Sequence, residues 1–407
     1  MAKLTKLSIK KFRNVAPTTL EFRPGLNVLL GRNAAGKTTF LRLLSTVLGT
    51  QEEALQEDVL EASYRASGKS LDFEHTITRS RVSEPALPLH PSQVLDGAPP
   101  SLRQTDSFVF ENDGVVVMRA EVLPSEVFLE IAGTRVHAER VFRGTPFMAI
   151  FGALMTHEKG SAWKELAGRI AAVGLRDTVR MDESLERFDA LLKFAARRDA
   201  NALMSLSMRQ APRSMHELIS VPMPEGTSAT FSLAFLDRAA HVLGYDSASA
   251  RFDVERLSPD PSQKIVRLSN LRFFFKRPGE EISHDLLSYG QKRLLAFFAH
   301  ADASDDVIIA DELVNGLHHE WITACLDEIG DRQAFLTSQN PLLLDFLRFD
   351  SVEEVRRTFI LCERAQGESG AQLVWRNPTE EEAESFFLAY QTGIQRVSDI
   401  LLTKGLW

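Results

Sequence analysis

Gly31-Arg-Asn-Ala-Ala-Gly-Lys-Thr38 is the stretch of this 407-residue sequence that decides the fold. It fits the pattern G-x-x-x-x-G-K-[ST], whose glycines let the backbone wrap around a polyphosphate with successive N–H groups pointing inward. The apolar run Leu26–Leu30 before it predicts a buried strand, and Phe40–Leu44 after it predicts the start of a helix. The four fixed positions coincide by chance in only about 1–2% of chains of this length. We therefore interpret the stretch as a phosphate-binding loop.

The residue types in this loop predict ATP and Mg²⁺ as its ligands. Lys37 is expected to reach the β- and γ-phosphates, and the Thr38 hydroxyl to hold Mg²⁺. The N-terminus of the following helix adds unpaired N–H donors and partial positive charge. The other residues expected to surround the nucleotide are Arg32, Asn33, Ala34, Ala35, Gly36 and Thr39.

Composition and charge exclude several classes of protein. The hydrophobic fraction is 44% and the charged fraction 25%, as in ordinary globular proteins, and the net charge is −8. An acidic chain does not attract nucleic acid as a whole, although a local basic patch could. The two cysteines, Cys325 and Cys362, favour neither a disulfide framework nor a zinc site. With no apolar stretch of about 18–20 residues and no signal peptide, we expect a cytoplasmic protein without membrane contact.

Residues 1–150 contain the phosphate-binding loop and several predicted strands. Residues 3–13 and 19–22 indicate strands, and the segment from Leu71 to Arg143 indicates an antiparallel β subdomain with two hairpins, one of them turning at Asp113-Gly114. The Pro-rich stretch Glu84–Pro100 indicates a surface loop.

Residues 151–223 predict a helical insertion, because apolar residues recur at helical spacing around Trp163–Val173 and Leu185–Ala195. The insertion is too short and too aperiodic for a long coiled coil. It carries basic residues that form either a solvated helix face or a surface for nucleic acid or a partner: Lys193, Arg197, Arg198, Arg209 and Arg213.

A second phosphate-binding turn is predicted at Leu287-Ser-Tyr-Gly-Gln291, which matches L-S-x-G-Q and precedes a helix. A Ser288 hydroxyl, a Gly290 N–H and a helix N-terminus suit a γ-phosphate, with Gln291 beside them. The alternative is that Ser288 only caps the helix.

Two acids follow the apolar run Val307–Ala310, which predicts a buried parallel strand. Carboxylates at the end of such a strand are costly to bury unless they have a function. Asp311 is expected to hold the hydration shell of Mg²⁺, and Glu312 to orient and deprotonate the attacking water. The next predicted strand, Ala334–Leu336, ends in Thr337–Pro341.

In this order the motifs resemble those of the ABC-type ATPases, and within them the branch of RecF, SMC and OLD (overcoming lysogenization defect) proteins. The opening Leu7–Asn14, the roughly 250 residues between the first loop and Leu287, and Asp311–His318, which looks like the DE-x-x-NGLH form of defence-associated ATPases, carry the resemblance. It implies an α/β fold, namely a P-loop NTPase head with a mixed central sheet, an antiparallel β subdomain and a helical insertion. Residues 1–150 would form the N-terminal part of this head and 224–376 its C-terminal part, and 377–407 would form a helical tail.

The resemblance further implies a head-to-tail homodimer around ATP. The nucleotide would lie between Lys37 of one chain and Ser288 and Gly290 of the other, with His318 at the dimer seam and Arg13 among the nucleotide-binding residues. Neither half-site would be complete alone, so ATP binding would join the chains and hydrolysis would release them.

The chain also departs from the family pattern. Gln339 stands where these ATPases usually have a histidine, and it is either a phosphate contact that makes turnover slow or a local turn residue. Gln104 is the nearest candidate for the glutamine of the switch loop, which stays unassigned. About 65 residues follow the Thr337–Pro341 segment, which contains Gln339. These are too few for the nuclease domain of OLD proteins, so an effector such as a nuclease or toxin would be a separate polypeptide.

Three functions remain open at this point. The first is an ATP-gated switch for that effector, in anti-phage defence or DNA maintenance, and the second is a RecF-like clamp that binds DNA directly. The third is a nucleotide-bound scaffold with slow turnover.

Overall fold

The computed structural model describes residues 2–50, 52–81, 102–140, 145–156, 160–173, 178, 180–182, 184–198, 203–206, 211–219, 224, 226–257, 265–367 and 370–406. The chain forms two compact units. The terminal unit comprises Met1–Thr178 and Phe349–Trp407, and the central unit comprises Val179–Arg348. The loop predicted at Glu84–Pro100 and the basic residue Arg209 lie outside the described residues.

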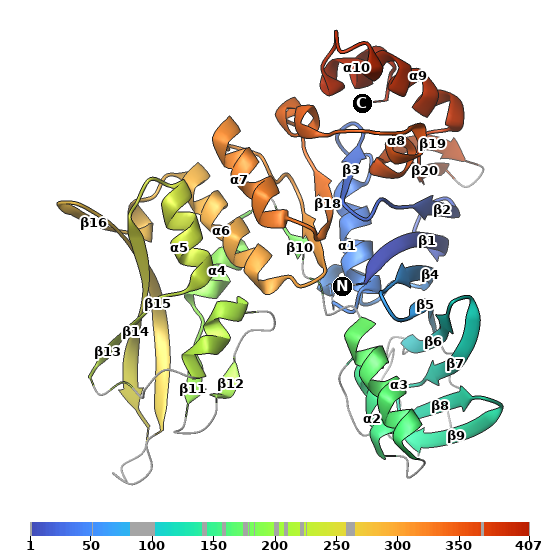
Figure 1. The fold of residues 1–407 in the computed structure, drawn as a ribbon, viewed down its shortest axis with the longest axis horizontal. Helices are drawn as coiled ribbons and strands as arrows, with labels where there is room; N and C mark the ends of the chain where they lie inside the picture. Colours follow the sequence, from blue (N-terminus) through green and yellow to red (C-terminus); the bar gives the residue numbers. More distant parts are fainter. Residues whose placement is uncertain are drawn as a thin grey trace, which may run out of the picture. The chain divides into compact units, whose positions relative to one another are not determined.

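An eight-stranded antiparallel sheet forms much of the terminal unit (Figure 1). Inward-facing apolar residues alternate with exposed polar ones along its strands, so one face is buried. The predicted turn at Asp113-Gly114 is confirmed, with φ of 49° and 78°, as a two-residue hairpin loop requires. The strand order is β2 (Thr18–Glu21), β1 (Lys3–Phe12), β4 (Leu60–Ser67), β5 (Asp72–Arg81), β6 (Leu102–Asn112), β7 (Val115–Val122), β8 (Glu126–Ile131) and β9 (Thr134–Glu139).

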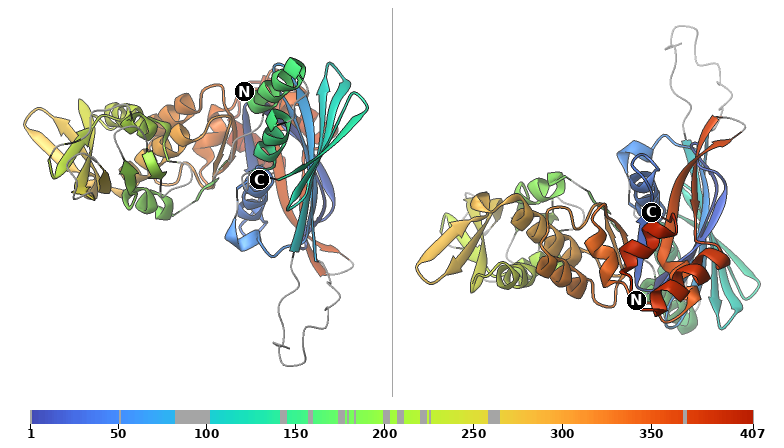
Figure 2. Two further views of the ribbon diagram at one scale, coloured as in Figure 1. Left: turned by 90° about the horizontal axis from the view of Figure 1, so that it is seen from below. Right: turned by 90° about the horizontal axis from the view of Figure 1, so that it is seen from above.

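Helices α2 (Pro146–Thr156) and α3 (Gly160–Val173) lie together on one face of this sheet, where α2 contacts β7 and β8 (Figure 2). Phe147 of α2 packs edge-on against Phe73 and Phe108 of the sheet, at ring distances of 5.1 and 5.0 Å. The helix predicted from the apolar spacing around Trp163–Val173 is confirmed as α3.

The phosphate-binding loop belongs to a second layer of the terminal unit. Strand β3 (Leu26–Leu30) leads into the loop and helix α1 (Lys37–Val47) leads out of it, as predicted. Strand β19 (Phe359–Gly367) pairs parallel with β3 and antiparallel with β20 (Gly370–Arg376). Around them lie η1 (Glu53–Leu55), α8 (Val352–Thr358), α9 (Glu380–Gln391) and α10 (Val397–Thr403).

Two helices of the C-terminal segment begin at residues whose side chains cap them. Thr379 and Glu382 form a reciprocal capping box at the start of α9. Ser351 caps α8, which Arg357 and Thr358 complete, so strand β19 begins at Phe359.

In the central unit, three parallel strands carry the strand-end acids. Strand β17 (Val307–Ala310) lies between β10 (Arg180–Met181) and β18 (Gln333–Thr337). Every residue of β17 and β18 is buried, as the continuous apolar runs predict. Helices α6 (Tyr289–Ala303) and α7 (His319–Ile329) accompany these strands, with short 3₁₀ turns η3 (His284–Leu286) and η4 (Pro341–Phe346).

The rest of the central unit is an antiparallel sheet covered by short helices. The order is β12 (Leu203–Leu206), β11 (Ala196–Arg198), β15 (Val266–Arg277), β14 (Ser247–Arg256) and β13 (Ser228–Phe231), with β16 (Glu280–Ser283) paired to β15. Asn270, at φ 55°, shifts the alternation of β15, so Leu268, Leu271 and Phe273 are all buried. Helices α4 (Glu186–Leu192) and α5 (Ala234–Val242) contact β15 and β14, and η2 (Arg213–Ile219) contacts α6.

The predicted helical insertion at 151–223 is a mixture of helices and strands. It supplies α2 and α3 to the terminal unit, but β10, α4, β11, β12 and η2 to the central unit. Helical spacing around Leu185–Ala195 predicted α4 correctly, yet the chain then pairs as β11 with β15, a contact distant in sequence. No helix in the described part of the chain is long and apolar enough to cross a membrane.

Candidate functional site

The backbone of the phosphate-binding loop depends on its two motif glycines. A Cβ on Gly31 would lie 2.2 Å from the carbonyl oxygen of Cys362 in β19, and Gly31 has φ of 144°. A Cβ on Gly36 would lie 2.8 Å from a methyl group of Leu373 in β20. The loop is thus pressed against β19 and β20, and only glycine fits at these positions.

Replacing Gly31 by Ala is expected to destabilise the protein by about 1–3 kcal/mol, because the added methyl meets a backbone carbonyl at an unfavourable φ. The control is Gly25→Ala, six residues earlier, where a Cβ would meet nothing within 4 Å. Urea-induced unfolding followed by circular dichroism measures both variants. Equal midpoints for the two would contradict the packing argument.

The polar groups of the loop face an open surface. The Lys37 ammonium donates to the carbonyl oxygens of Gly31 at 2.7 Å and Arg32 at 3.3 Å, so it reaches back over the loop mouth. Thr38 is exposed, and no side chain caps the N-terminus of α1. Of the remaining predicted residues, Arg32, Asn33 and Ala34 are exposed, Gly36 and Thr39 are half-buried, and Ala35 is buried.

One residue supporting this loop was missed by sequence reasoning. Trp375 of β20 is fully buried, packs edge-on against Phe40 of α1 at a ring distance of 5.2 Å, and has its indole nitrogen 3.3 Å from the position of a Cβ on Gly36. The only local signal was an alternating strand near the C-terminus. Its position beneath the loop follows from the pairing of β20 with β19 and of β19 with β3.

Arg13 and Gln104 both have partners within the terminal unit. Arg13, at φ 43°, donates to Asp58 at 2.8 Å and also to the carbonyl oxygen of Ala54. Gln104 accepts from Arg79 at 3.0 Å and belongs to the eight-stranded sheet. Their placement supports a structural role for Gln104, while Arg13 stays a predicted nucleotide contact.

In the central unit, the two strand-end acids are joined by a threonine. Thr337, at the end of β18, donates its hydroxyl to Asp311 Oδ1 at 2.6 Å and accepts from the backbone N–H of Glu312 at 2.7 Å. Asp311 is 4% exposed and Glu312 is 6% exposed. The carboxyl ends of β17 and β18, which are parallel neighbours, therefore place Thr337 beside the two predicted acids.

Two arginines hold this strand end, and neither was predicted. Arg293 of α6 is fully buried and donates to the carbonyl oxygens of Asp311 at 2.9 Å and Leu313 at 3.4 Å, and also to that of Glu312. Arg180 of β10 lies 3.5 Å from Asp311 Oδ2. A charged residue on the inward face of an otherwise apolar helix was the available signal for Arg293.

Gln339 contacts the acid through its backbone. Its N–H donates to Glu312 Oε2 at 3.0 Å, whereas its side chain is exposed. Glu312 itself has φ of 51°, an uncommon conformation for a non-glycine residue. The backbone at Gln339 thus orients the Glu312 carboxylate, and the side-chain amide of Gln339 takes no part in this contact.

The turn at 288–291 is an exposed helix start. Ser288 Oγ accepts from the N–H of Gln291 at 3.4 Å, while Gln291 Oε1 accepts from the N–H of Ser288 at 2.8 Å, forming a capping box. A Cβ on Gly290 would lie 2.5 Å from the carbonyl oxygen of Gly316. The predicted phosphate-binding turn at 287–291, called the signature turn from here on, therefore packs directly on the Asp311–His318 segment.

His318 occupies the N-cap position of α7, is exposed, and packs edge-on against Trp321 at a ring distance of 5.1 Å. Its exposure suits the predicted role at a dimer seam, which stays a prediction.

A buried histidine anchors the segment just before the signature turn. His284 Nδ1 accepts from the N–H of Phe273 at 3.2 Å, which requires the neutral ring. Burial lowers the pKa of His284, and the nearby carboxylate of Asp285 opposes that shift. His284 thereby fixes the start of η3, from which the turn continues.

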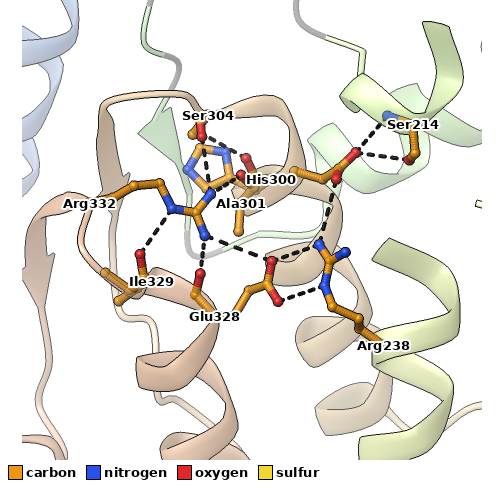
Figure 3. Close-up of polar contacts among 9 residues, drawn as sticks. Ser214, Arg238, His300, Ala301, Ser304, Glu328, Ile329 and Arg332 are labelled. Carbon is orange, nitrogen blue, oxygen red and sulfur yellow. Dashed lines mark hydrogen bonds and ion pairs between the residues drawn. The ribbon is translucent and has the colours of Figure 1, made fainter. Parts of the chain in front are cut away.

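An ion-pair network holds the C-terminal end of α6, the helix that begins at the signature turn (Figure 3). Arg238 of α5 donates to both oxygens of Glu328 in α7, at 2.8 and 2.9 Å, which raises the pKa of Arg238. Asp302 of α6 accepts from the N–H and hydroxyl of Ser214, both at 2.9 Å. Arg332 donates to the carbonyl oxygens of Ala301, Ser304, Glu328 and Ile329, and burial lowers its pKa.

Each unit holds groups of the kind that bind a nucleoside triphosphate with Mg²⁺. In the terminal unit, the glycine cradle with Lys37 suits phosphate oxygens, and the Thr38 hydroxyl is an oxygen ligand of the kind Mg²⁺ prefers. In the central unit, the Asp311 carboxylate is an oxygen ligand of the same kind. Glu312 is a buried carboxylate suited to accept a proton from water.

Two family profiles match the chain over the segments that carry these motifs. A profile described as an AAA domain matches residues 6–82. A second, described as "AAA domain, putative AbiEii toxin, Type IV TA system", matches residues 174–345.

The curated relatives resemble only part of the chain. The DNA replication and repair protein RecF of Streptococcus pneumoniae (strain CGSP14) is 46% identical over 55 residues, which are 14% of this chain and 15% of that protein. RecF of Limosilactobacillus reuteri (strain DSM 20016) is 29% identical over 105 residues, covering 20% of this chain and 28% of that protein. The chain thus spans less than a third of the length of the relatives it matches.

Among solved structures, an SMC head bound to the C-winged helix domain of ScpA matches 92% of this chain and 98% of its own, with 11% identity and a TM-score of 0.41. The phosphate-binding loop, the strand-end acids and the matches to AAA profiles and to RecF agree on one assignment. Together these matches support an ABC-type ATPase of the branch that includes RecF.

Proposed function

We propose that this protein binds Mg·ATP at the loop 31–38 and hydrolyses it with Glu312 as the general base. The observation that carries the proposal is the strand end of the central unit, where Thr337, Arg293 and the Gln339 N–H hold Asp311 and Glu312 in fixed positions. Lys37 offsets charge on the phosphates, and bound Mg²⁺ supplies further charge stabilisation. Phosphate release from ATP by the purified protein tests this activity directly.

We further propose that two copies associate head to tail through the signature turn, so that ATP binding joins them and hydrolysis releases them. The exposed Ser288, Tyr289 and His318 support this, since a surface that must meet a second chain has to be accessible. Neither copy would turn over ATP alone.

Replacing Ser288 by Ala is expected to lower ATP turnover about 10²-fold, because a hydroxyl donor to the phosphate is lost. The control is Ser351→Ala, which removes an equivalent N-cap bond, 3.2 Å long, at α8. Each substitution is expected to cost about 1 kcal/mol of stability. Steady-state phosphate release by both variants at saturating ATP gives the comparison, and unchanged turnover in Ser288→Ala would exclude the signature role.

The biological role we propose is a switch for a separate effector, such as a nuclease or toxin, in anti-phage defence. The match of residues 174–345 to a profile that includes a putative toxin supports it. Pulldown with the products of neighbouring genes, with ATP and with ADP, tests it. A protein that stays alone, and whose assembly ATP does not change, would contradict it.

A RecF-like DNA clamp is the second candidate, favoured by the match of the N-terminal segment to RecF. Gel shifts with duplex DNA across a range of salt concentrations distinguish the two, because a clamp that contacts phosphates binds with a steep salt dependence. A third candidate is a nucleotide-bound scaffold with slow turnover, because Gln339 stands where these ATPases usually have a histidine. The phosphate-release assay distinguishes such a scaffold from an active switch.

A further inference from the structure

Strand β9 ends the eight-stranded sheet of the terminal unit, and within the described residues no strand pairs with its outer side (Figure 1). A tight turn at Ala132-Gly133, with φ of 48° and 77°, connects it to β8. An open edge strand presents unpaired N–H and C=O groups and is a template for another strand.

The register of β8 and β9 shows which backbone groups point outward. The N–H of Arg140 donates to the carbonyl oxygen of Ser125 at 2.9 Å, and the pairs continue through Phe128–His137 to Ile131–Thr134. Since hydrogen-bonded and non-hydrogen-bonded pairs alternate in an antiparallel ladder, Thr134, Val136 and Ala138 bond toward β8. The N–H and C=O groups of Arg135, His137 and Glu139 therefore point to the open edge.

The charges along this edge are incompletely balanced. Glu139 lies directly opposite Glu126, and like charges at such a position are destabilising. Glu126 pairs with His137 at 3.3 Å, whereas Glu139 makes no ion pair with any described residue. Arg135 is 3.7 Å from Glu130, but its side chain is 87% exposed. The edge thus carries a carboxylate that lacks a cation and a guanidinium that is nearly free in solvent.

We propose that β9 pairs antiparallel with β9 of a second copy about a two-fold axis at His137. This register places Arg135 opposite the partner's Glu139 and Glu139 opposite the partner's Arg135. The outward N–H groups of Arg135, His137 and Glu139 then each meet a carbonyl oxygen of the other copy. Two sheets would join into one.

The occupant follows from the sequence of the strand itself. A parallel in-register pair would set Arg135 against its own copy, whereas the antiparallel arrangement matches opposite charges on both sides of the axis. Phe128, 38% exposed, stacks on His137 with ring centroids 4.8 Å apart, so this apolar ring would be covered at the axis. The contact uses none of the residues proposed for the ATP-dependent dimer and requires no nucleotide.

Charge reversal tests the pairing by sedimentation velocity without nucleotide. The unmodified protein is expected to dimerise, and Arg135→Glu or Glu139→Arg to raise the dissociation constant at least about tenfold, since both symmetric contacts become repulsive. The double variant is expected to restore dimers. An equimolar mixture of the two single variants should also associate, because each presents the charge that the other lacks.

Two further variants make the test specific. Glu121→Arg reverses an exposed charge on β7, inside the sheet and opposite Phe128, and is expected to leave the dimer intact. His137→Pro removes an outward N–H and the side-chain contact with Glu126, but no backbone hydrogen bond to β8, and is expected to abolish association. A nucleotide-free monomer, or single variants that associate as well as the unmodified protein, would overturn the proposal. So would a dimer that forms only with ATP and is lost in Ser288→Ala, which would belong to the signature turn.

Discussion

Replacing Glu312 by Gln is expected to reduce phosphate release from ATP by about 10²–10⁴-fold, because the general base is removed. The amide oxygen of Gln can still accept the bond from the Gln339 N–H that Glu312 Oε2 accepts at 3.0 Å. The fold of the strand end and the affinity for ATP are therefore expected to persist. Single-turnover phosphate release and equilibrium binding of a fluorescent ATP analogue separate the two quantities.

The matched control for this experiment is Glu320→Gln, the same change at an exposed carboxylate in the first turn of α7. It is expected to leave turnover unchanged. If Glu312→Gln hydrolysed ATP as fast as the unmodified protein, Glu312 would not be the base. If the unmodified protein itself hydrolysed ATP too slowly to measure, the result would favour the nucleotide-bound scaffold over the ATP-gated switch.

Replacing Arg293 by Met is expected to destabilise the protein by about 3 kcal/mol, the largest effect on folding that we foresee for one side chain. Arg293 is fully buried, and its removal leaves the carbonyl oxygens of Asp311, Glu312 and Leu313 without the donor that now serves them. The fall in the urea midpoint of unfolding, followed by circular dichroism, measures the effect.

The neighbouring Lys292→Met is the control, since Lys292 directly precedes Arg293 in α6 and is only half-buried. The free energy of unfolding of this control variant is expected to change by less than about 0.5 kcal/mol. A midpoint for Arg293→Met as high as that of Lys292→Met would show that water replaces the guanidinium at the strand end. Positioning of Asp311 would then have to come from Thr337 and Arg180.

The sequence predicted those parts of the site whose conformation is set locally. Ser288 and Gln291 cap each other across three residues, and the glycines at 31 and 36 adopt conformations that the motif spacing requires. The strand predicted at Val307–Ala310 has the same bounds in the structure. Such features depend on hydrogen bonds and backbone sterics within a few residues, so they can be inferred without the fold.

Other parts could not be predicted because their partners are distant in sequence. The helical spacing of 185–195 gave no sign that residues 196–198 would pair with β15, where tertiary pairing outweighs local preference. Trp375 lies beneath a loop more than 330 residues earlier, which only the pairing of β3, β19 and β20 brings about.

By itself, then, the sequence determined the phosphate-binding loop, the capped signature turn and the strand-end acids, since each is encoded by neighbouring residues. Only the tertiary structure decided how the acids are held: Arg293, Arg180 and Thr337 reach Asp311 and Glu312 from three other elements. It alone also exposed β9 as an edge, because whether a strand has a neighbour depends on the order of the whole sheet.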